Sequence, residues 1–196
     1  MASQVWRPPL TATFIHRDHA VELIPIGPQH RQLLADSFGQ LSERSRYYRF
    51  MAPMTQLSDA DLAYLTDLDM VDHFAWGVLI DGHAAGVGRY ARAQPGSRAA
   101  EVGMTILDDY QGKGLGTLLV ECLGVVARAA GYTAFEFEVL SENTAMLTIL
   151  ERLGAALARH DGVVHAEVPL SNVPEPIVEP RVLVDVVESA RTAPAG

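Results

Sequence analysis

One stretch of the chain constrains the fold more than any other: a strand-like run, a glycine-rich turn and a long apolar helix follow one another between residues 100 and 130. In the run AEVGMTI, strand alternation places Glu101, Gly103 and Thr105 on one face and the apolar residues on the other. Apolar residues then recur at helical spacing from Gly114 to Ala130. A strand that feeds directly into a helix predicts a mixed α/β domain.

The turn between this strand and this helix has the properties of an anion-binding site. Gly112, Gly114 and Gly116 let the backbone bend tightly, and the first amides of the helix have no intrahelical acceptor. A P-loop is excluded because Leu107 stands where its first glycine is required and Lys113 is followed by glycine. A dinucleotide fingerprint is excluded because the glycines alternate as G-x-G-x-G.

The rest of the chain alternates between short strands and helices. Asp81-Gly82 and Asp161-Gly162 each separate two β-like runs and predict hairpins, because a type I′ turn requires positive φ. Pro28, Ser42, Ser58 and Ser141 are predicted to begin helices. The expected strands lie at residues 21–26, 74–80, 84–92, 100–106, 132–140, 156–159 and 163–168.

Composition bounds the class of protein. The 196 residues are 48% hydrophobic, which suffices for one domain at residues 20–170, between an arm at 1–19 and a proline-containing tail at 171–196. Within the tail, a loosely held segment is favoured for VLVDVV at 182–187, with an ordered strand or helix as the alternative. The net charge of −9 argues against nucleic acid as a partner.

Location follows from the same composition. The chain has a single cysteine and no apolar run of the length needed for a secretory signal or a bilayer span. We therefore expect a cytoplasmic protein with no membrane partner. A monomer and a homodimer both remain open.

The segment EVGMTILDDYQGKGLGTLL contains the spacing Q-x-x-G-x-G at Gln111, Gly114 and Gly116. It resembles the acetyl-CoA pyrophosphate motif of the GNAT N-acetyltransferase superfamily. Asn143 and Gly154 match the asparagine-to-glycine spacing of the family's next helix, so the resemblance covers about residues 20–170. It implies a central, mostly antiparallel, V-splayed sheet of six to seven strands flanked by helices.

More narrowly, LSERSRYYRFM and EVLSENTAML resemble the catalytic domain of bacterial protein lysine acetyltransferases of the Pat type. The resemblance implies that acetyl-CoA is the co-substrate and that an acetyl group moves directly from the thioester to an amine. The residue spacing leads us to expect no metal. The implied coenzyme-binding residues are Met104, Thr105, Ile106, Gln111, Gly112, Lys113, Gly114, Leu115, Gly116, Thr117 and Asn143.

The chemistry requires a base more than an acid. A lysine amine has a pKa of about 10.4, so its deprotonation at pH 7 costs about 4.6 kcal/mol, whereas a thiolate with a pKa of about 8.5 leaves more readily. Glu101 matches the glutamate assigned as general base in Pat-type enzymes, with Glu138 as the reserve candidate. Many family members have an acid-catalysing tyrosine seven residues beyond the asparagine, and this chain has Leu150 there.

Three other features of the sequence could bear on function: an arginine-rich and tyrosine-rich segment, the single cysteine and a pair of histidines. The RSRYYRF segment at residues 44–50 either lines the acceptor groove, binds the nucleotide phosphate or packs as an ordinary helix. Cys122 lies on an apolar helical stripe and is expected to be a packed core thiol. His160 and His165 lie close together across a predicted hairpin, but no carboxylate or thiolate spacing supports a metal site.

The sequence therefore favours an acetyl-CoA-dependent N-acetyltransferase whose preferred acceptor is a protein lysine ε-amine. A small-molecule amine, such as an aminoglycoside or a polyamine, is the alternative acceptor. A non-catalytic acyl-CoA sensor or interaction module is the alternative of another class, since the missing tyrosine would also fit a site that has lost activity.

Overall fold

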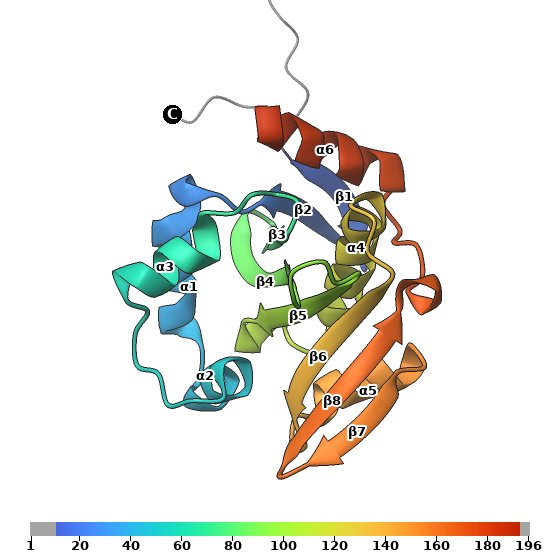
Figure 1. Ribbon diagram of the computed structural model, residues 1–196. Coiled ribbons are helices and arrows are strands. Elements are labelled where there is room, and N and C mark those ends of the chain that lie inside the picture. The colour runs from blue at the N-terminus through green and yellow to red at the C-terminus, as the bar shows by residue number, and fades with distance from the viewer. Residues whose placement is uncertain (1–10, 193–196) are drawn as a thin grey trace, which may run out of the picture.

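The computed structural model describes residues 11–192, which form one mixed sheet covered by helices on both faces (Figure 1). The eight strands follow the order β1-β2-β3-β4-β5-β6-β8-β7. Only the β5–β6 pair is parallel, so the sheet is mostly antiparallel, as expected. The strands are β1 (Ala12–His16), β2 (His19–Pro25), β3 (His73–Ile80), β4 (His83–Arg92), β5 (Ala99–Ile106), β6 (Ala134–Leu140), β7 (Ala156–His160) and β8 (Val163–Pro169).

The helices divide between the two faces. Helix α4 packs on β3, β4 and β5 and buries Leu119 and Leu123 completely, while α1 and α3 pack on each other and α1 also contacts β4. The helices are α1 (Arg31–Gln40), α2 (Glu43–Phe50), α3 (Asp59–Thr66), α4 (Leu115–Ala129), α5 (Thr144–Arg152) and α6 (Pro180–Thr192). Three short 3-10 turns are η1 (Pro28–His30), η2 (Asp108–Tyr110) and η3 (Leu170–Asn172).

The parallel pair β5–β6 opens into a V. Its register contains only three partner pairs, from Ala99 opposite Ala134 to Glu101 opposite Glu136. Beyond Glu101, β5 stays paired with β4 through Ile106, and β6 stays paired with β8 through Leu140. The two strands therefore separate immediately after Glu101, and the inner edge of β5 is left without a strand partner.

Several local predictions are confirmed. Asp81 and Gly82 have φ of 50° and 80°, and Asp161 and Gly162 have φ of 47° and 81°, so both predicted hairpin turns use left-handed residues. Ser58 forms the predicted capping box, accepting from the Asp61 amide while the Asp61 carboxylate accepts from the Ser58 amide.

Three expectations need correction. The sheet has eight strands because residues 12–16, expected in the N-terminal arm, pair with β2 as β1. Residues 180–192, expected in a loose tail, form α6, which buries Leu183 against α4, β1 and β2. Ser141 does not begin α5: the cap is Asn143, whose Oδ1 accepts from the Met146 amide at 3.2 Å. Trp6 and the Pro8-Pro9 pair lie outside the described residues.

Candidate active site

A cleft of about 880 Å³ lies where β5 and β6 separate, bounded by α2, α5 and the first turn of α4. Every residue expected in the active site lines this cleft except Lys113. The ammonium of Lys113 instead lies 4.9 Å from the centre of the Tyr110 ring. The cleft walls thus bring together Glu101, Met104, Thr105, Ile106, Gln111, Gly112, Gly114, Leu115, Gly116, Thr117 and Asn143.

The turn before α4 presents a row of free amides to the cleft. Gly112 and Gly114 have φ of 73° and 84°, a conformation that glycine adopts without strain. The first bond into the helix runs from the Leu118 amide to the Gly114 carbonyl, and among residues 11–192 no backbone acceptor receives the amides from Gly112 to Thr117. The positive end of the helix dipole adds to their attraction for an anion.

Gly116 contributes through close packing rather than through a positive φ. A Cβ at this position would lie 3.0 Å from Cδ1 of Ile149 on α5. The missing side chain therefore lets α5 approach the start of α4 and close the floor of the cleft.

Gln111 holds the turn in place. Its Nε2 donates to the Ile106 carbonyl at 3.1 Å and to Ser45 Oγ at 3.2 Å. Ser45 Oγ in turn donates to Asp108, whose carboxylate also accepts from the amide and hydroxyl of Ser42. Burial works to raise the pKa of Asp108, but the bonds from Ser42 and Ser45 outweigh it and lower that pKa. This network ties the turn to α2.

Arg17 was not anticipated from the sequence. It lies in the β1–β2 turn at φ of 49°, and its guanidinium crosses the glycine-rich turn, so that a Cβ at Gly114 would be 3.1 Å from Cζ of Arg17. Among residues 11–192 the guanidinium has no acidic partner within 4 Å. The signal that could have found it is a second strand before the predicted strand at residues 21–26, because residues 12–16 were expected in the N-terminal arm.

Glu101 is exposed at the apex of the V, on the face of β5 opposite α4. Gly103 and Thr105 share that face, as the alternation of AEVGMTI predicts, and Val102, Met104 and Ile106 join the core beneath α4. A carboxylate at this point can reach an amine that enters between the separated strands.

Glu138, the reserve candidate for the base, is already paired with a histidine. Glu138 lines the cleft, but its Oε1 lies 3.3 Å from Nδ1 of His165 on β8, and both side chains are about half exposed. Leu150 is fully buried and does not line the cleft, so that position supplies no acidic side chain there. Cys122 is also fully buried, and burial raises the pKa of its thiol, which excludes it as a nucleophile.

Asn143 combines two roles that the sequence left as alternatives. Its Oδ1 caps α5, while its Nδ2 has no acceptor among residues 11–192 and the residue lines the cleft. Next to it, the Tyr48 hydroxyl donates to the Glu142 carbonyl at 3.2 Å. This bond joins α2 to the β6–α5 loop across one end of the cleft.

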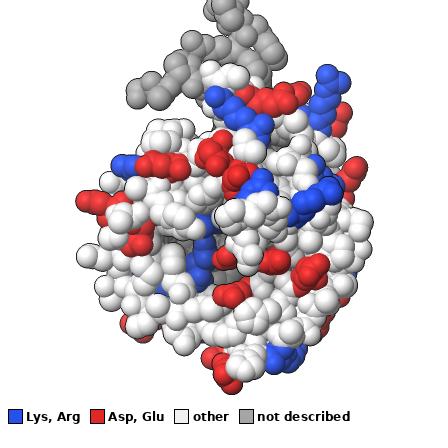
Figure 2. All heavy atoms as spheres, viewed as in Figure 1, with Lys and Arg blue, Asp and Glu red and all other residues white. Residues whose placement is uncertain are grey.

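The RSRYYRF segment lies in α2, where some of its side chains line the cleft and others pack as in an ordinary helix. Arg44, Tyr48 and Arg49 line the cleft. Arg46 instead packs 4.8 Å over the Phe38 ring and donates to the Gly39 carbonyl at 3.1 Å, which is a structural role. Figure 2 shows basic side chains in the hollow in the middle of this face, with acidic side chains beside them.

Comparison with known proteins identifies the family. The profile of the acetyltransferase (GNAT) domain matches residues 21–156, more than half of the chain. The chain belongs to the GNAT acetyltransferase family. The match begins after Arg17, so the β1–β2 turn that reaches the glycine-rich turn lies outside it.

Relatives of the Pat type are among the similar proteins. Acetyltransferase Pat of Mycolicibacterium smegmatis is 36% identical over 156 residues, which are 78% of this chain and 46% of Pat, so the chain spans about half of that relative. An acetyltransferase of Pseudomonas aeruginosa is 30% identical over 153 residues, 71% of this chain and 82% of that protein. The GNAT domain of S. lividans PAT superimposes with a TM-score of 0.76 at 32% identity, covering 82% of this chain and 97% of that domain.

No helix between residues 11 and 192 is long and apolar enough to cross a membrane. Within the same range, no three His, Cys, Asp or Glu side chains gather in a way that could hold a metal ion.

Proposed function

We propose that this protein is an N-acetyltransferase that moves an acetyl group from acetyl-CoA directly to a protein lysine ε-amine. The observation that carries the proposal is one cleft lined both by the glycine-rich turn, where the amides of Gly112 and of Gly114 to Thr117 have no backbone acceptor among residues 11–192, and by Glu101. The first feature suits a diphosphate and the second suits an amine. Similarity to the Pat-type relatives supports lysine as the acceptor.

Coenzyme binding follows from the shape of the site. The amides before α4 would hold the pyrophosphate, and Arg17 would add a positive charge above it. The inner edge of β5 at Met104, Thr105 and Ile106 would pair with the pantetheine arm as an added strand. The free Nδ2 of Asn143 would donate to the same arm.

Catalysis follows from the position of Glu101. The carboxylate, directly or through a water molecule, takes the proton of the acceptor ammonium, and the amine then attacks the thioester carbonyl. A backbone amide of β5 stabilises the developing oxyanion. The departing thiolate needs no side-chain acid, in agreement with the buried Leu150.

The test is thiol release from acetyl-CoA in the presence of lysine peptides and of small amines, alongside calorimetry with coenzyme A. We expect coenzyme A to bind and lysine peptides to be acetylated. Thiol release with small amines but not with lysine peptides would show that the acceptor is a small-molecule amine. Binding without release from any acceptor would support a non-catalytic acyl-CoA sensor, and an absence of coenzyme binding would refute the proposal altogether.

A further inference from the structure

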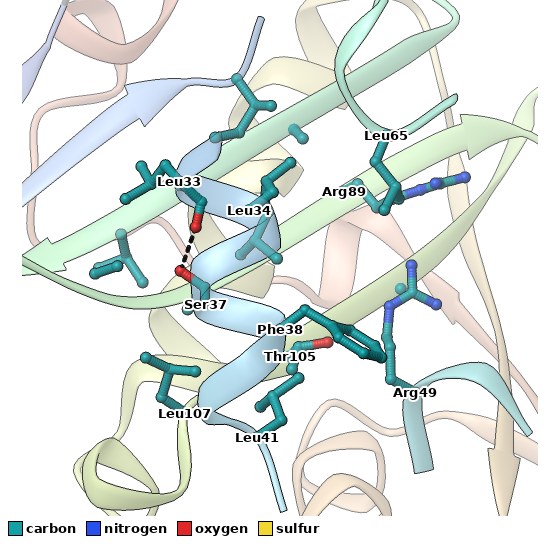
Figure 3. Close-up of a pocket in the computed structure, with 18 of the residues that line it drawn as sticks. Leu33, Leu34, Ser37, Phe38, Leu41, Arg49, Leu65, Arg89, Thr105 and Leu107 are labelled. Atoms are coloured by element: carbon teal, nitrogen blue, oxygen red, sulfur yellow. Dashed lines mark hydrogen bonds between the residues drawn. The ribbon is translucent and has the colours of Figure 1, made fainter. Parts of the chain in front are cut away.

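Two arginines meet on the face of β5 that carries Glu101. Arg49 reaches in from α2 and lays its guanidinium over Gly103, where a Cβ would be 2.7 Å from Cζ of Arg49. Arg89 on β4 is the register partner of Gly103, so its side chain rises from the same face immediately beside it. Figure 3 shows both side chains on the same side of the pocket that α1 covers.

Neither arginine has an acidic partner. Among residues 11–192 no carboxylate lies within 4 Å of either guanidinium, and no hydrogen bond from Arg49 is found. Arg89 donates to the Tyr64 hydroxyl at 2.6 Å and lies 4.4 Å from the centre of that ring. Burial, together with the charge of Arg89, lowers the pKa of Arg49 to about 10, while the charge of Glu101 opposes that shift. Arg49 is therefore still cationic at neutral pH.

Such an arrangement favours a further anion, because Glu101 acts on Arg49 only from beyond 4 Å. Two adjacent like charges repel each other, and the donors of a half-buried guanidinium require acceptors. Two other arginines near the sheet have acidic partners: Arg31 pairs with Asp67, and Arg92 pairs with Asp72. Arg49 and Arg89 thus place two guanidinium groups without a carboxylate within 4 Å on the face of the sheet that carries Glu101.

The two guanidinium groups lie beside the reacting centre. Residues two apart on a strand are about 7 Å apart, which is the separation of Gly103 from Glu101 along β5. Arg49 also lines a small apolar pocket of about 70 Å³ between α1 and the sheet, whose walls include Leu34, Phe38 and Val87. An acceptor amine at Glu101 would therefore have cations and an apolar surface next to it.

We propose that Arg49 and Arg89 bind a carboxylate carried by the amine acceptor, and that they select acceptors in which an acidic group lies near the amine. The inference rests on the proposed function and specifies its acceptor. The carboxylate belongs either to an acidic side chain beside the target lysine or to the acceptor's own α-carboxylate, and the two sources call for separate arms of one experiment.

The experiment measures kcat/KM with acceptor pairs that differ only in the acid. One arm compares lysine peptides that carry Glu or Gln next to the lysine, and the other compares free lysine with lysinamide. We expect the acidic member of at least one pair to be preferred about tenfold, the effect of one charge-assisted contact. The arm that shows the preference identifies the source of the carboxylate.

Three variants assign the preference to the arginines. In Arg49→Gln and Arg89→Gln the ratio between acidic and neutral acceptors should fall to near one. Gly103→Ala should also lower it, because the new methyl group displaces the Arg49 guanidinium without removing its charge. Arg159→Gln, an exposed arginine on β7, is the control for loss of one charge and should keep the wild-type ratio.

A binding arm keeps this inference separate from the proposed function. Calorimetry with the same acceptors, on the protein saturated with coenzyme A, reports the carboxylate contact without turnover. If no acceptor reacts but the acidic members bind more tightly to the wild type than to Arg49→Gln, the proposed function fails and the carboxylate site stands. The inference is overturned if the wild type shows the same kcat/KM for acidic and neutral acceptors. It is also overturned if the preference for acidic acceptors persists in both arginine variants.

Discussion

At the scale of single residues, Glu101 and Glu138 offer a matched pair of carboxylates on the two arms of the V. Only Glu101 lacks a basic partner within 4 Å among residues 11–192, since Glu138 pairs with His165. We expect Glu101→Gln to lower kcat about 100-fold at pH 7, because the acceptor ammonium loses its base, while coenzyme affinity stays constant. Steady-state thiol release and calorimetry measure the two quantities.

Glu138→Gln is the control for that prediction. Its loss removes only an exposed pair with His165, so kcat should change by less than about threefold. Equal losses of kcat in the two variants would contradict the assignment of Glu101 as the base.

Arg17 is a second residue whose role can be isolated. Because its guanidinium crosses the glycine-rich turn, Arg17→Gln should raise the Kd for coenzyme A about tenfold and leave the affinity for pantetheine, which lacks the nucleotide phosphates, unchanged. Calorimetry with the two ligands tests this expectation. A parallel loss of affinity for pantetheine would show that Arg17 acts on the fold of the cleft and not on phosphate.

At the scale of elements, the turn that begins α4 depends on the left-handed conformation of Gly114. Gly114→Ala places a side chain at φ of 84° and 3.1 Å from Arg17, so we expect a loss of about 1 to 2 kcal/mol in the free energy of unfolding and weaker coenzyme binding. Urea unfolding and calorimetry measure both effects.

Gly39→Ala is the matched control for the turn. Gly39 lies inside α1, its φ is not positive, and a Cβ there meets nothing within 4 Å. This change should stabilise the protein by about 0.5 to 1 kcal/mol. Equal stability of the two alanine variants would show that the turn does not need its left-handed glycine.

The packing of helix α6 can be tested by its effect on the free energy of unfolding. Leu183 is fully buried against the domain, whereas its neighbour Val182 is 37% exposed. Leu183→Ala should lower the free energy of unfolding by about 2 to 5 kcal/mol, and Val182→Ala should have a much smaller effect. Thermal and urea denaturation of the two variants distinguish a packed helix from a loose tail, for which both changes would be near neutral.

At the scale of the whole molecule, His73 couples stability to pH. Burial and the charge of Arg89 lower its pKa to about 4, against an opposing effect of Asp69, and its Nε2 is buried without a partner. The unfolded chain binds a proton at His73 near pH 6.5, whereas the folded protein does not, so stability falls as the pH drops from about 7 to 4.

His73→Phe should remove part of this acid sensitivity. We expect the difference in the free energy of unfolding between pH 7 and pH 5 to shrink by about 1 kcal/mol in the variant, a value reduced for partial solvent exposure. Urea unfolding at the two pH values measures it. His83→Phe, at an exposed position, should leave the difference as in the wild type, and an unchanged difference in His73→Phe would contradict the coupling.

The sequence by itself determined the features that depend on neighbours in the chain. The glycine spacing from Gly112 to Gly116, the Asp-Gly hairpins and the alternation around Glu101 all follow from local φ and strand geometry, and the structure reproduces each of them. The family followed from the same segments, and all but one of the predicted site residues line the cleft, whereas Arg17 was not predicted.

Only the tertiary structure decided what depends on contacts between distant segments. Strand β1 needs β2 to pair with, and its Arg17-Asp18 turn carries no glycine that would mark it in the sequence. Helix α6 is stable because α4 covers its apolar face. Arg17 lies over Gly114 and Arg49 lies over Gly103, although each pair is separated by more than fifty positions in the sequence. Side-chain periodicity reports only on residues close together in the chain, so the sequence does not predict these two contacts.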